Sequence, residues 1–187
     1  NERLSRGDTF VKQVGGAELN VAVGAALLGL HTGVISKLPA HDIGSFMKGK
    51  IRSFGVSDDF FMYDQSPAAR VGIYYYENGA YPRKPKVIYD RNHSSFFSLD
   101  IDEIPEEVYT ASKCFHTTGI TLALNEEIRE TTIEMIKRFK AAGTLVSFDV
   151  NFRGNLWTGD QARECILRIL PYVDIFFCSE DTARLTF

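Results

Sequence analysis

Two short segments of this chain contain arginines placed where they could bind an anionic, hydroxyl-rich small molecule. The first, Asp149-Val150-Asn151-Phe152-Arg153, follows an apolar run that is typical of a strand. The guanidinium of Arg153 is a rigid fork that suits a carboxylate or a phosphate. An Asp149–Arg153 ion pair that merely holds the loop together is the structural alternative.

The second segment, Tyr89-Asp90-Arg91, ends another strand-like run and places an arginine beside an aromatic ring. Arg91 could clamp an anionic substrate from above, and the phenol of Tyr74, on the companion strand, could reach a sugar hydroxyl. The structural alternatives are a surface salt bridge made by Asp90 and ordinary packing of Tyr74, since aromatic residues in strands more often pack.

A pair of glycines marks a third segment, Val14-Gly15-Gly16-Ala17-Glu18-Leu19-Asn20, between a strand-like run and an apolar run over residues 21–30 that predicts a buried helix. Adjacent glycines permit positive φ angles and let the backbone approach a ligand closely. Asn20 lies where we expect the helix to begin, so its side chain could cap that helix or donate to a ligand hydroxyl. A plain strand–turn–helix connection is the alternative.

Length and composition exclude several classes of function. The chain has 187 residues, enough for one α/β domain, and its net charge of −3 argues against general nucleic-acid binding. No apolar run approaches the ~18 residues of a membrane span, and residues 1–6 contain no signal-peptide core. The three widely spaced cysteines predict buried free thiols in the reducing cytoplasm. The four histidines lack metal-ligand spacing, so we assign no metal-binding residue.

From residue 100 onward, strand-like and helix-like runs alternate, which predicts βαβ units and a parallel sheet flanked by helices. We expect helix caps at Asn125, at Thr158 or Asp160, and at Ser179. Ligands of such sheets lie beyond the carboxyl ends of the strands. The segments that we expect to meet there are Gly15-Gly16, Thr117-Thr118-Gly119-Ile120, Asp149 to Arg153 and Ser179-Glu180.

A small β-sheet should stand apart from this body. Its expected strands lie near residues 8–14, 59–63, 70–77 and 86–91, and Asn78-Gly79 is a strong hairpin signal. Such a flap could close over a substrate and exclude water, which a phosphoryl transfer requires. Its exposed edges and aromatic residues also predict self-association of the chain.

Four stretches in register resemble the PfkB (ribokinase-like) carbohydrate kinases, and the chain is most similar to the 2-keto-3-deoxygluconate kinases within that family. These stretches cover almost the whole chain: Gly15-Gly16-Ala17-Glu18-Leu19-Asn20-Val21-Ala22, Val87-Ile88-Tyr89-Asp90-Arg91, His116-Thr117-Thr118-Gly119-Ile120-Thr121, and Asp149-Val150-Asn151-Phe152-Arg153 with Leu156-Trp157. The resemblance implies an α/β body with a β-sheet lid, and transfer of the γ-phosphate of ATP, with Mg²⁺, to a sugar hydroxyl.

The resemblance also assigns roles to residues. It implies that Arg153 is catalytic, lies between substrate and nucleotide, and steadies the transferring phosphoryl group. Asn151 would contact the nucleotide together with Arg153. The residues implied to contact the substrate, besides Arg153, are Gly16, Asn20, Tyr74, Tyr89, Arg91 and Ile120.

The chain departs from the family pattern in three ways. It lacks the Gly-Ala-Gly-Asp motif that carries the catalytic Asp, it lacks the usual opening strand, and it has Ser179-Glu180-Asp181-Thr182 where the family has a magnesium-organising Asn-x-x-Glu. We therefore expect residues 1–187 to be the N-terminal part of one kinase domain, truncated at both ends, with the catalytic Asp beyond residue 187. We expect this segment alone to bind ATP poorly and to have no kinase activity.

The leading functional hypothesis is ATP-dependent phosphorylation of 2-keto-3-deoxygluconate to its 6-phosphate. A fructokinase or a 5-keto-2-deoxygluconate kinase of the same family is the nearest alternative, and Arg91 discriminates because a neutral sugar needs no carboxylate clamp. A non-catalytic sugar-binding or regulatory module is an alternative of another class. The expected partners are a small sugar acid, ATP and further copies of the chain, joined through the lid.

Overall fold

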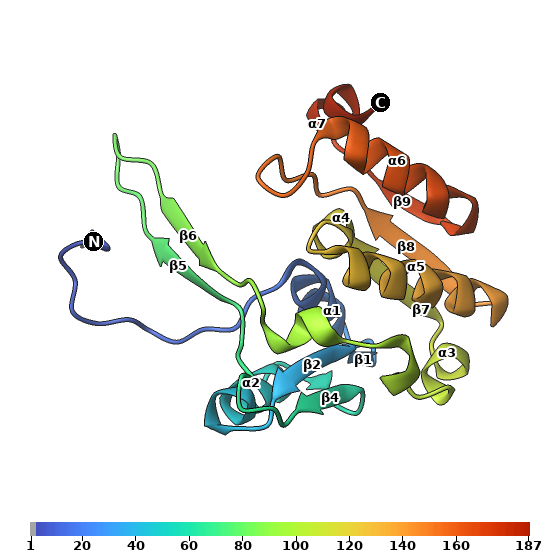
Figure 1. The fold of residues 1–187 in the computed structure, drawn as a ribbon, viewed down its shortest axis with the longest axis horizontal. Helices are drawn as coiled ribbons and strands as arrows, with labels where there is room; N and C mark the ends of the chain where they lie inside the picture. Colours follow the sequence, from blue (N-terminus) through green and yellow to red (C-terminus); the bar gives the residue numbers. More distant parts are fainter. Residues whose placement is uncertain (1–2) are drawn as a thin grey trace.

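The computed structural model describes residues 3–187 as an α/β body from which a β-hairpin projects (Figure 1). Helices and parallel strands alternate in the body, as the sequence pattern predicts. The elements before the hairpin are α1 (Ala17–Leu27), β1 (Thr32–Gly33), β2 (Ser36–Pro39), α2 (Asp42–Arg52), β3 (Val56–Ser57) and β4 (Phe61–Asp64).

The hairpin and the region after it account for the remaining elements. The hairpin consists of β5 (Ile73–Glu77) and β6 (Lys86–Asp90), which pair antiparallel. Short 3₁₀ turns at Ser95–Ser98, Ile101–Glu103 and Leu170–Tyr172 join some of the later elements. The later helices and strands are α3 (Glu107–Ala111), β7 (Cys114–Thr118), α4 (Gly119–Leu122), α5 (Glu126–Ala141), β8 (Leu145–Asp149), α6 (Gly159–Ile169), β9 (Ile175–Phe177) and α7 (Glu180–Thr186).

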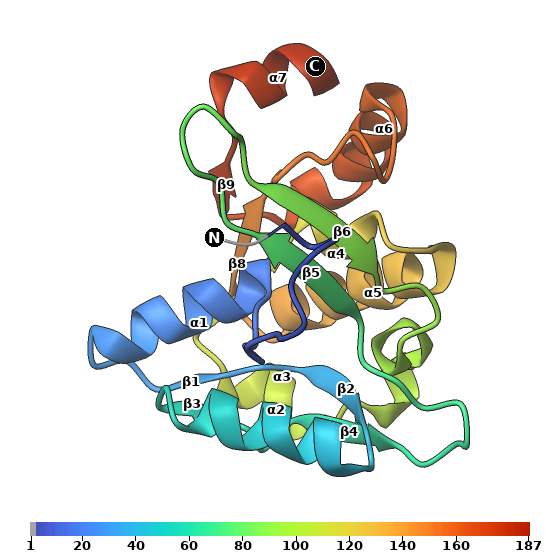
Figure 2. The same ribbon diagram turned by 90° about the vertical axis from the view of Figure 1, so that its left-hand side faces the viewer.

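All strand pairs of the body are parallel: β7, β8 and β9 form one sheet in that order, while β1 pairs with β3 and β2 pairs with β4. In the register of the three-stranded sheet, Thr118 lies opposite Asp149, and Asp149 lies opposite Phe177. The carboxyl ends of these strands therefore meet at one edge. Figure 2 views the hairpin from the front, with α1, α4 and β8 behind it.

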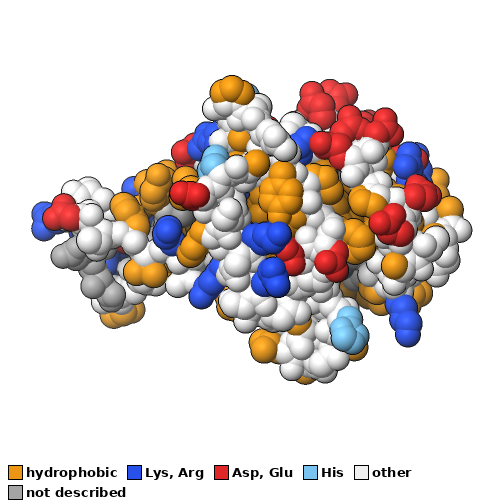
Figure 3. Space-filling view, turned by 90° about the horizontal axis from the view of Figure 1, so that it is seen from below, with side chains coloured by type: hydrophobic (Ala, Val, Ile, Leu, Met, Phe, Trp, Pro, Cys, Tyr) orange, Lys and Arg blue, Asp and Glu red, His pale blue; other side chains and the backbone are white. Residues whose placement is uncertain are grey.

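Two hydrophobic clusters hold the body together. The larger packs α5 and α6 around β8, where Phe148 has no exposed surface. The smaller joins the first helices and strands through Leu19, Leu38 and Phe61. On the face shown in Figure 3, hydrophobic side chains are scattered among polar ones and acidic groups gather toward one edge. Within residues 3–187, no helix is both long and apolar enough to span a bilayer.

Local capping signals are confirmed. Asn125 caps α5 by accepting from the Ile128 amide at 2.9 Å, and Gly143 follows this helix with a φ of +84°. Thr158 begins α6 with a capping box, and Ser179 caps α7 by accepting from the Thr182 amide. These helices were predictable because their start signals lie within three residues of the groups they satisfy.

Several expectations from the sequence are wrong. Residues 8–14 form no strand, and β4 pairs with β2 in the body, so the lid is a two-stranded hairpin in residues 3–187. Helix α1 begins at Ala17 without a side-chain cap, and its only buried residue is Leu19. Asn20 thus lies inside the helix and does not cap it.

The prediction of three buried thiols is also wrong in part. Cys165 is buried and Cys178 is half-buried, but Cys114 is exposed, and all are free. Cys114 is the first residue of β7, where the strand emerges from the core. An apolar neighbourhood in sequence did not ensure burial at the end of a strand.

Candidate active site

The edge formed by the ends of β7 and β8 positions the turn that contains Gly119 and Ile120. Helix α4 begins immediately at the end of β7, and a Cβ atom at residue 119 would overlap the carbonyl oxygen of Val150. Only glycine fits this close approach. Thr118 caps the turn, because its hydroxyl accepts from the amide of Ile120 at 3.2 Å.

Helix α1 is fastened to this turn by Glu18. Its Oε1 atom accepts from the Thr118 amide at 3.0 Å, from the Thr118 hydroxyl at 2.9 Å and from the Thr121 hydroxyl at 2.7 Å. Gly16, at the start of α1, and Ile120 are thereby held on neighbouring elements. The sequence analysis gave Glu18 no role. Its signal was a carboxylate inside the glycine motif, but its partners lie about a hundred residues away.

The hairpin reaches the glycine turn through Tyr74. A Cβ atom at Gly15 would overlap the hydroxyl of Tyr74, so the tyrosine tip rests directly on this glycine. The exposed position of Tyr74 on β5 leaves 48% of its surface accessible. The approach explains why residue 15 has no side chain, and it brings a phenol next to Gly16.

On the opposite strand of the hairpin, Tyr89 lies beside Tyr74, and Arg91 directly follows this strand, against Gly72. Tyr89 pairs with Tyr74 across the hairpin, with ring centroids 6.3 Å apart. The guanidinium carbon of Arg91 is 4.5 Å from the centroid of the Tyr89 ring, a cation–π distance. Stacking of this kind orients the planar guanidinium and leaves its N–H groups available to an anion.

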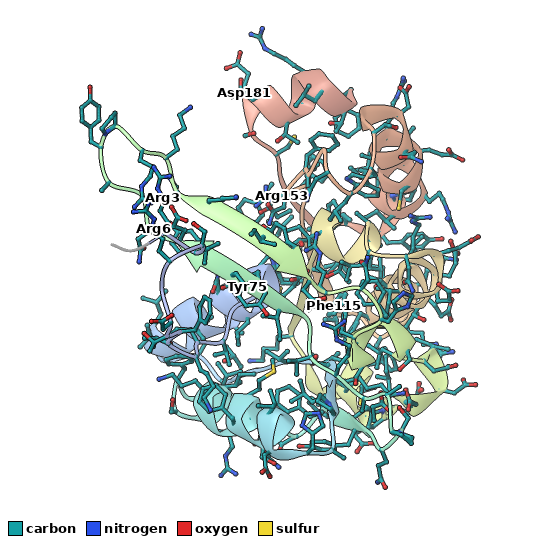
Figure 4. All side chains as sticks on the ribbon, turned by 60° about the vertical axis from the view of Figure 1, so that its left-hand side comes forward. Arg3, Arg6, Tyr75, Phe115, Arg153 and Asp181 are labelled. Carbon is teal, nitrogen blue, oxygen red and sulfur yellow. The ribbon has the colours of Figure 1, made fainter. Side chains whose placement is uncertain are left out.

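Arg91 also approaches Arg153 of the body. Burial lowers the pKa of Arg91 below its ordinary value, and the nearby positive charge of Arg153 lowers it further. Figure 4 shows Arg153 on the loop after β8, beside the hairpin. Within residues 3–187, neither arginine forms an ion pair with a carboxylate. Two cations that repel each other without a counter-ion mark a place where an anion would be stabilised.

The structure also shows which ion pairs form near the two arginines. Asp149 does not pair with Arg153, because its carboxylate accepts from the amide of Asn151 at 3.0 Å. Asn151 has a positive φ of 38°, and Arg153 donates only to the Phe152 carbonyl, at 3.1 Å. Asp90 forms its surface salt bridge with Arg70, at 2.8 Å, so Arg91 remains available.

Asn20 is the predicted site residue with the fewest observed contacts. It is exposed on α1, one turn after Gly16, and its backbone N–H donates to the Gly16 carbonyl at 2.9 Å. Its side chain is therefore available beside the glycine turn. The predicted residues lie on four segments, namely α1, the hairpin, the start of α4 and the loop after β8, and we call the exposed surface that these segments border between hairpin and body the gap.

This gap is open, since Tyr74 and Tyr89 are each 48% exposed and Arg153 is exposed as well. Two hollows of about 440 and 330 Å³ lie elsewhere, one beside β3 and the other between residues 3–10 and the far end of β5. Neither contains a predicted site residue. No group of three or more metal-ligating side chains occurs in residues 3–187.

His116 lies on β7, close to this gap. Its Nδ1 atom is 3.0 Å from the Ser147 hydroxyl, while its buried Nε2 atom has no partner in residues 3–187. Burial lowers the pKa of His116, although the negative charges of Glu18 and Asp149 act in the opposite direction.

Comparisons with known proteins show similarity over most of the chain. A profile described as "pfkB family carbohydrate kinase" matches residues 1–187. The chain is 36% identical over 183 residues to the 2-dehydro-3-deoxygalactonokinase of Haloferax volcanii, covering 98% of this chain and 57% of that protein. It is 33% identical over 156 residues to the 2-dehydro-3-deoxygluconokinase of Bacillus subtilis, covering 82% of this chain and 47% of that protein.

The solved structures include a similar protein as well. The crystal structure of 2-dehydro-3-deoxygluconokinase from Thermotoga maritima matches with a TM-score of 0.92 and 33% identity, covering 98% of this chain and 56% of that one. The chain therefore spans about half the length of these relatives.

Proposed function

Because the chain belongs to the pfkB family of carbohydrate kinases and has its ribokinase-like α/β fold, we propose that it forms the sugar-binding part of an ATP-dependent sugar-acid kinase. The proposed reaction is phosphorylation of 2-keto-3-deoxygluconate, also named 2-dehydro-3-deoxygluconate, on its 6-hydroxyl. The relatives named for this substrate support the proposal.

The observation that carries the proposal is the uncompensated pair of arginines at the gap. Arg91 comes from the hairpin, Arg153 comes from the body, and the positive charge of Arg153 contributes, after burial, to lowering the pKa of Arg91. A substrate with a carboxylate at one end, and a phosphoryl group arriving at the other, would supply both counter-charges. We assign the carboxylate to Arg91 and the phosphoryl group to Arg153.

In the proposed transfer, the residues of this chain act by positioning and charge stabilisation. The sugar 6-hydroxyl would lie near Gly16 and Asn20, while Tyr74, Tyr89 and Arg91 hold the other end from above. Arg153 would stabilise the negative charge that spreads over the γ-phosphoryl oxygens as the bond to the leaving ADP breaks. We assign the base that accepts the hydroxyl proton to none of residues 3–187.

ATP supplies the phosphoryl group, and the half-buried Asn151 and the exposed Arg153 fit contacts with its phosphates. For Mg²⁺, residues 3–187 contain no cluster of three or more side chains that could ligate a metal ion. We therefore propose Mg²⁺ as a cofactor of the reaction but derive no step through it.

Two further proposals concern the setting of the reaction. Exposed apolar side chains on both faces of the hairpin, among them Tyr76 at 52% and Ile88 at 44%, support self-association through the lid. The free state of all three cysteines supports work in the reducing cytoplasm.

The alternatives differ in substrate charge or in chemistry. A fructokinase would not use Arg91 as a carboxylate clamp, whereas the substrate of a 5-keto-2-deoxygluconate kinase is itself a sugar acid with a carboxylate. The 2-dehydro-3-deoxygalactonate of the Haloferax relative has the same carboxylate, so the arginine pair does not distinguish it from the gluconate epimer. A non-catalytic sugar-binding module would bind without transfer.

The test is ATP-coupled turnover by the full-length protein with both 2-keto-3-deoxy sugar acids, fructose and 5-keto-2-deoxygluconate in parallel. Preference for the gluconate acid is the expected result, and preference for the galactonate acid would change only the stereochemical assignment. Preference for fructose would overturn the carboxylate assignment, and preference for 5-keto-2-deoxygluconate would keep the carboxylate but overturn the choice of sugar acid. Sugar binding without turnover would favour the module.

A further inference from the structure

The carboxylate of Glu18 lies between two walls of the sugar site and touches both. It belongs to the first turn of α1, whose N-terminus provides Gly16 and whose second turn provides Asn20. Its three hydrogen-bond donors all belong to the turn after β7, which provides Ile120. This turn and α1 are separated by about a hundred residues of sequence, so nothing local fixes their distance.

The hydrogen bonds also set the direction of the Thr118 hydroxyl. Because this hydroxyl donates to Glu18 at 2.9 Å, its lone pairs are free to accept from the amide of Ile120 at 3.2 Å. Thr118 is 1% exposed, so water cannot replace either partner easily. Glu18 therefore orients the Thr118 hydroxyl, and this hydroxyl in turn accepts from the Ile120 amide.

Electrostatics favour a carboxylate at this position. Glu18 lies in the first turn of α1, where the positive end of the helix dipole stabilises an anion. All three donors converge on the same oxygen, Oε1. A carboxylate oxygen accepts several donors at once, and charge-assisted hydrogen bonds are stronger than neutral ones.

We propose that Glu18 is a positioning residue for the sugar, which fixes the spacing between the start of α1 and the start of α4. This inference rests on the proposed function, because it assumes that the sugar contacts Gly16, Asn20 and Ile120. Glu18 itself does not touch the reacting atoms. The tie is the set of hydrogen bonds from Glu18 to Thr118 and Thr121, and without it the start of α1 and the start of α4 could move relative to each other. Small displacements of residues that position a substrate are costly to the reaction.

The variants separate the hydrogen bonds from the charge. Glu18→Ala removes the tie and should raise the KM for the sugar acid by ~10-fold or more, with the KM for ATP within about twofold. Glu18→Gln keeps an amide oxygen that can accept the same donors, and should stay within about threefold of the parent protein. Thr121→Val removes only the 2.7 Å bond and should raise the sugar KM by ~3-fold.

A matched control is available on the far side of the body. Glu130 also links two elements, because it accepts from both terminal nitrogens of Arg168, at 2.7 and 2.6 Å. Glu130→Ala should leave both KM values unchanged. An unchanged sugar KM in Glu18→Ala would overturn the proposal, as would an equal rise of both KM values or a Glu18→Gln variant as impaired as Glu18→Ala. If Glu18→Ala does not fold, Thr121→Val decides by the same comparison.

Hydrogen exchange of the Thr118 and Ile120 amides in the full-length protein gives a readout that does not need turnover. Glu18→Ala should speed exchange at both amides, and Glu130→Ala should not. If the parent protein turns over none of the sugars, the proposed function fails while the tie can still be confirmed. Unchanged exchange in Glu18→Ala would overturn the tie itself.

Discussion

Strands β8 and β6 have the same length but opposite surroundings. In β8, Val146, Ser147 and Phe148 are buried between helices, whereas every residue of β6 is exposed. The site draws residues from both settings: Arg153 follows the buried strand, and Arg91 follows the exposed one. Packing of buried side chains can position the site residues of the body. The hairpin has little packing of this kind to position its own site residues.

This difference indicates how the two halves of the site should respond to change. Variants of buried residues in the body should act first on stability, because they remove buried contacts. Variants in the hairpin should act first on binding, because the hairpin contributes few buried contacts to lose.

The largest expected effect is that of Phe148→Ala in β8. Phe148 has no exposed surface, so the truncation should lower the free energy of unfolding by ~3–5 kcal/mol. Chemical denaturation followed by circular dichroism measures it. A loss below ~1 kcal/mol would contradict the claim that buried contacts of β8 hold the body together.

Arg153→Ala should act on the chemical step with little effect on stability, since the side chain is exposed and forms no ion pair in residues 3–187. We expect kcat to fall by ~100-fold or more, with a smaller rise in the sugar KM, because charge develops in the transition state. Arg153→Lys is the matched variant and should retain part of the rate. A large rise in KM with kcat unchanged would mean that Arg153 serves only ground-state binding.

Gly15→Ala tests the contact between the two regions. Its methyl group would displace the Tyr74 hydroxyl, which lies at the end of a flexible side chain, so we expect a ~3–10-fold rise in the sugar KM and little loss of stability. In a double-mutant cycle, Tyr74→Phe removes the overlapping oxygen. The double variant should then be no worse than Tyr74→Phe alone. Strict additivity would contradict the contact.

Ile88→Ala in β6 should have the smallest effect on stability. This side chain is 44% exposed, so its truncation should cost less than ~1 kcal/mol by the same denaturation measurement as Phe148→Ala. A loss comparable to that of Phe148→Ala would show that the hairpin is as firmly packed as the body.

What the sequence predicted well was local. Neighbouring residues determine the helix caps at Asn125, Thr158 and Ser179. They also determine the alternation of strand and helix after residue 100, so the helices and the parallel body were recognisable. The strand ends then placed the Asp149 to Arg153 segment at the site by topology alone. The hairpin was recognisable for the same local reason, although its hydrogen-bonded turn lies at Ala80–Arg83 and not at Asn78-Gly79.

What the sequence did not reveal depends on distant partners. Within residues 3–187, residues 8–14 have no strand partner although they alternate like a strand, and Phe10 makes an edge contact with Tyr75. Phe61 looked like part of the lid because nothing local indicates that β4 pairs with β2. Glu18 was missed since its hydrogen-bond donors lie beyond residue 117.

The most direct test of the arginine pair compares one variant on two substrates. For the full-length protein and its Arg91→Ala variant, kcat/KM would be measured with 2-keto-3-deoxygluconate and with fructose, and Arg91→Lys would serve as the charge-retaining control. We expect Arg91→Ala to lose ~2–4 kcal/mol of binding to the sugar acid and to change little with fructose. Equal losses on both substrates, or no loss on the acid, would contradict the assignment of the carboxylate to Arg91.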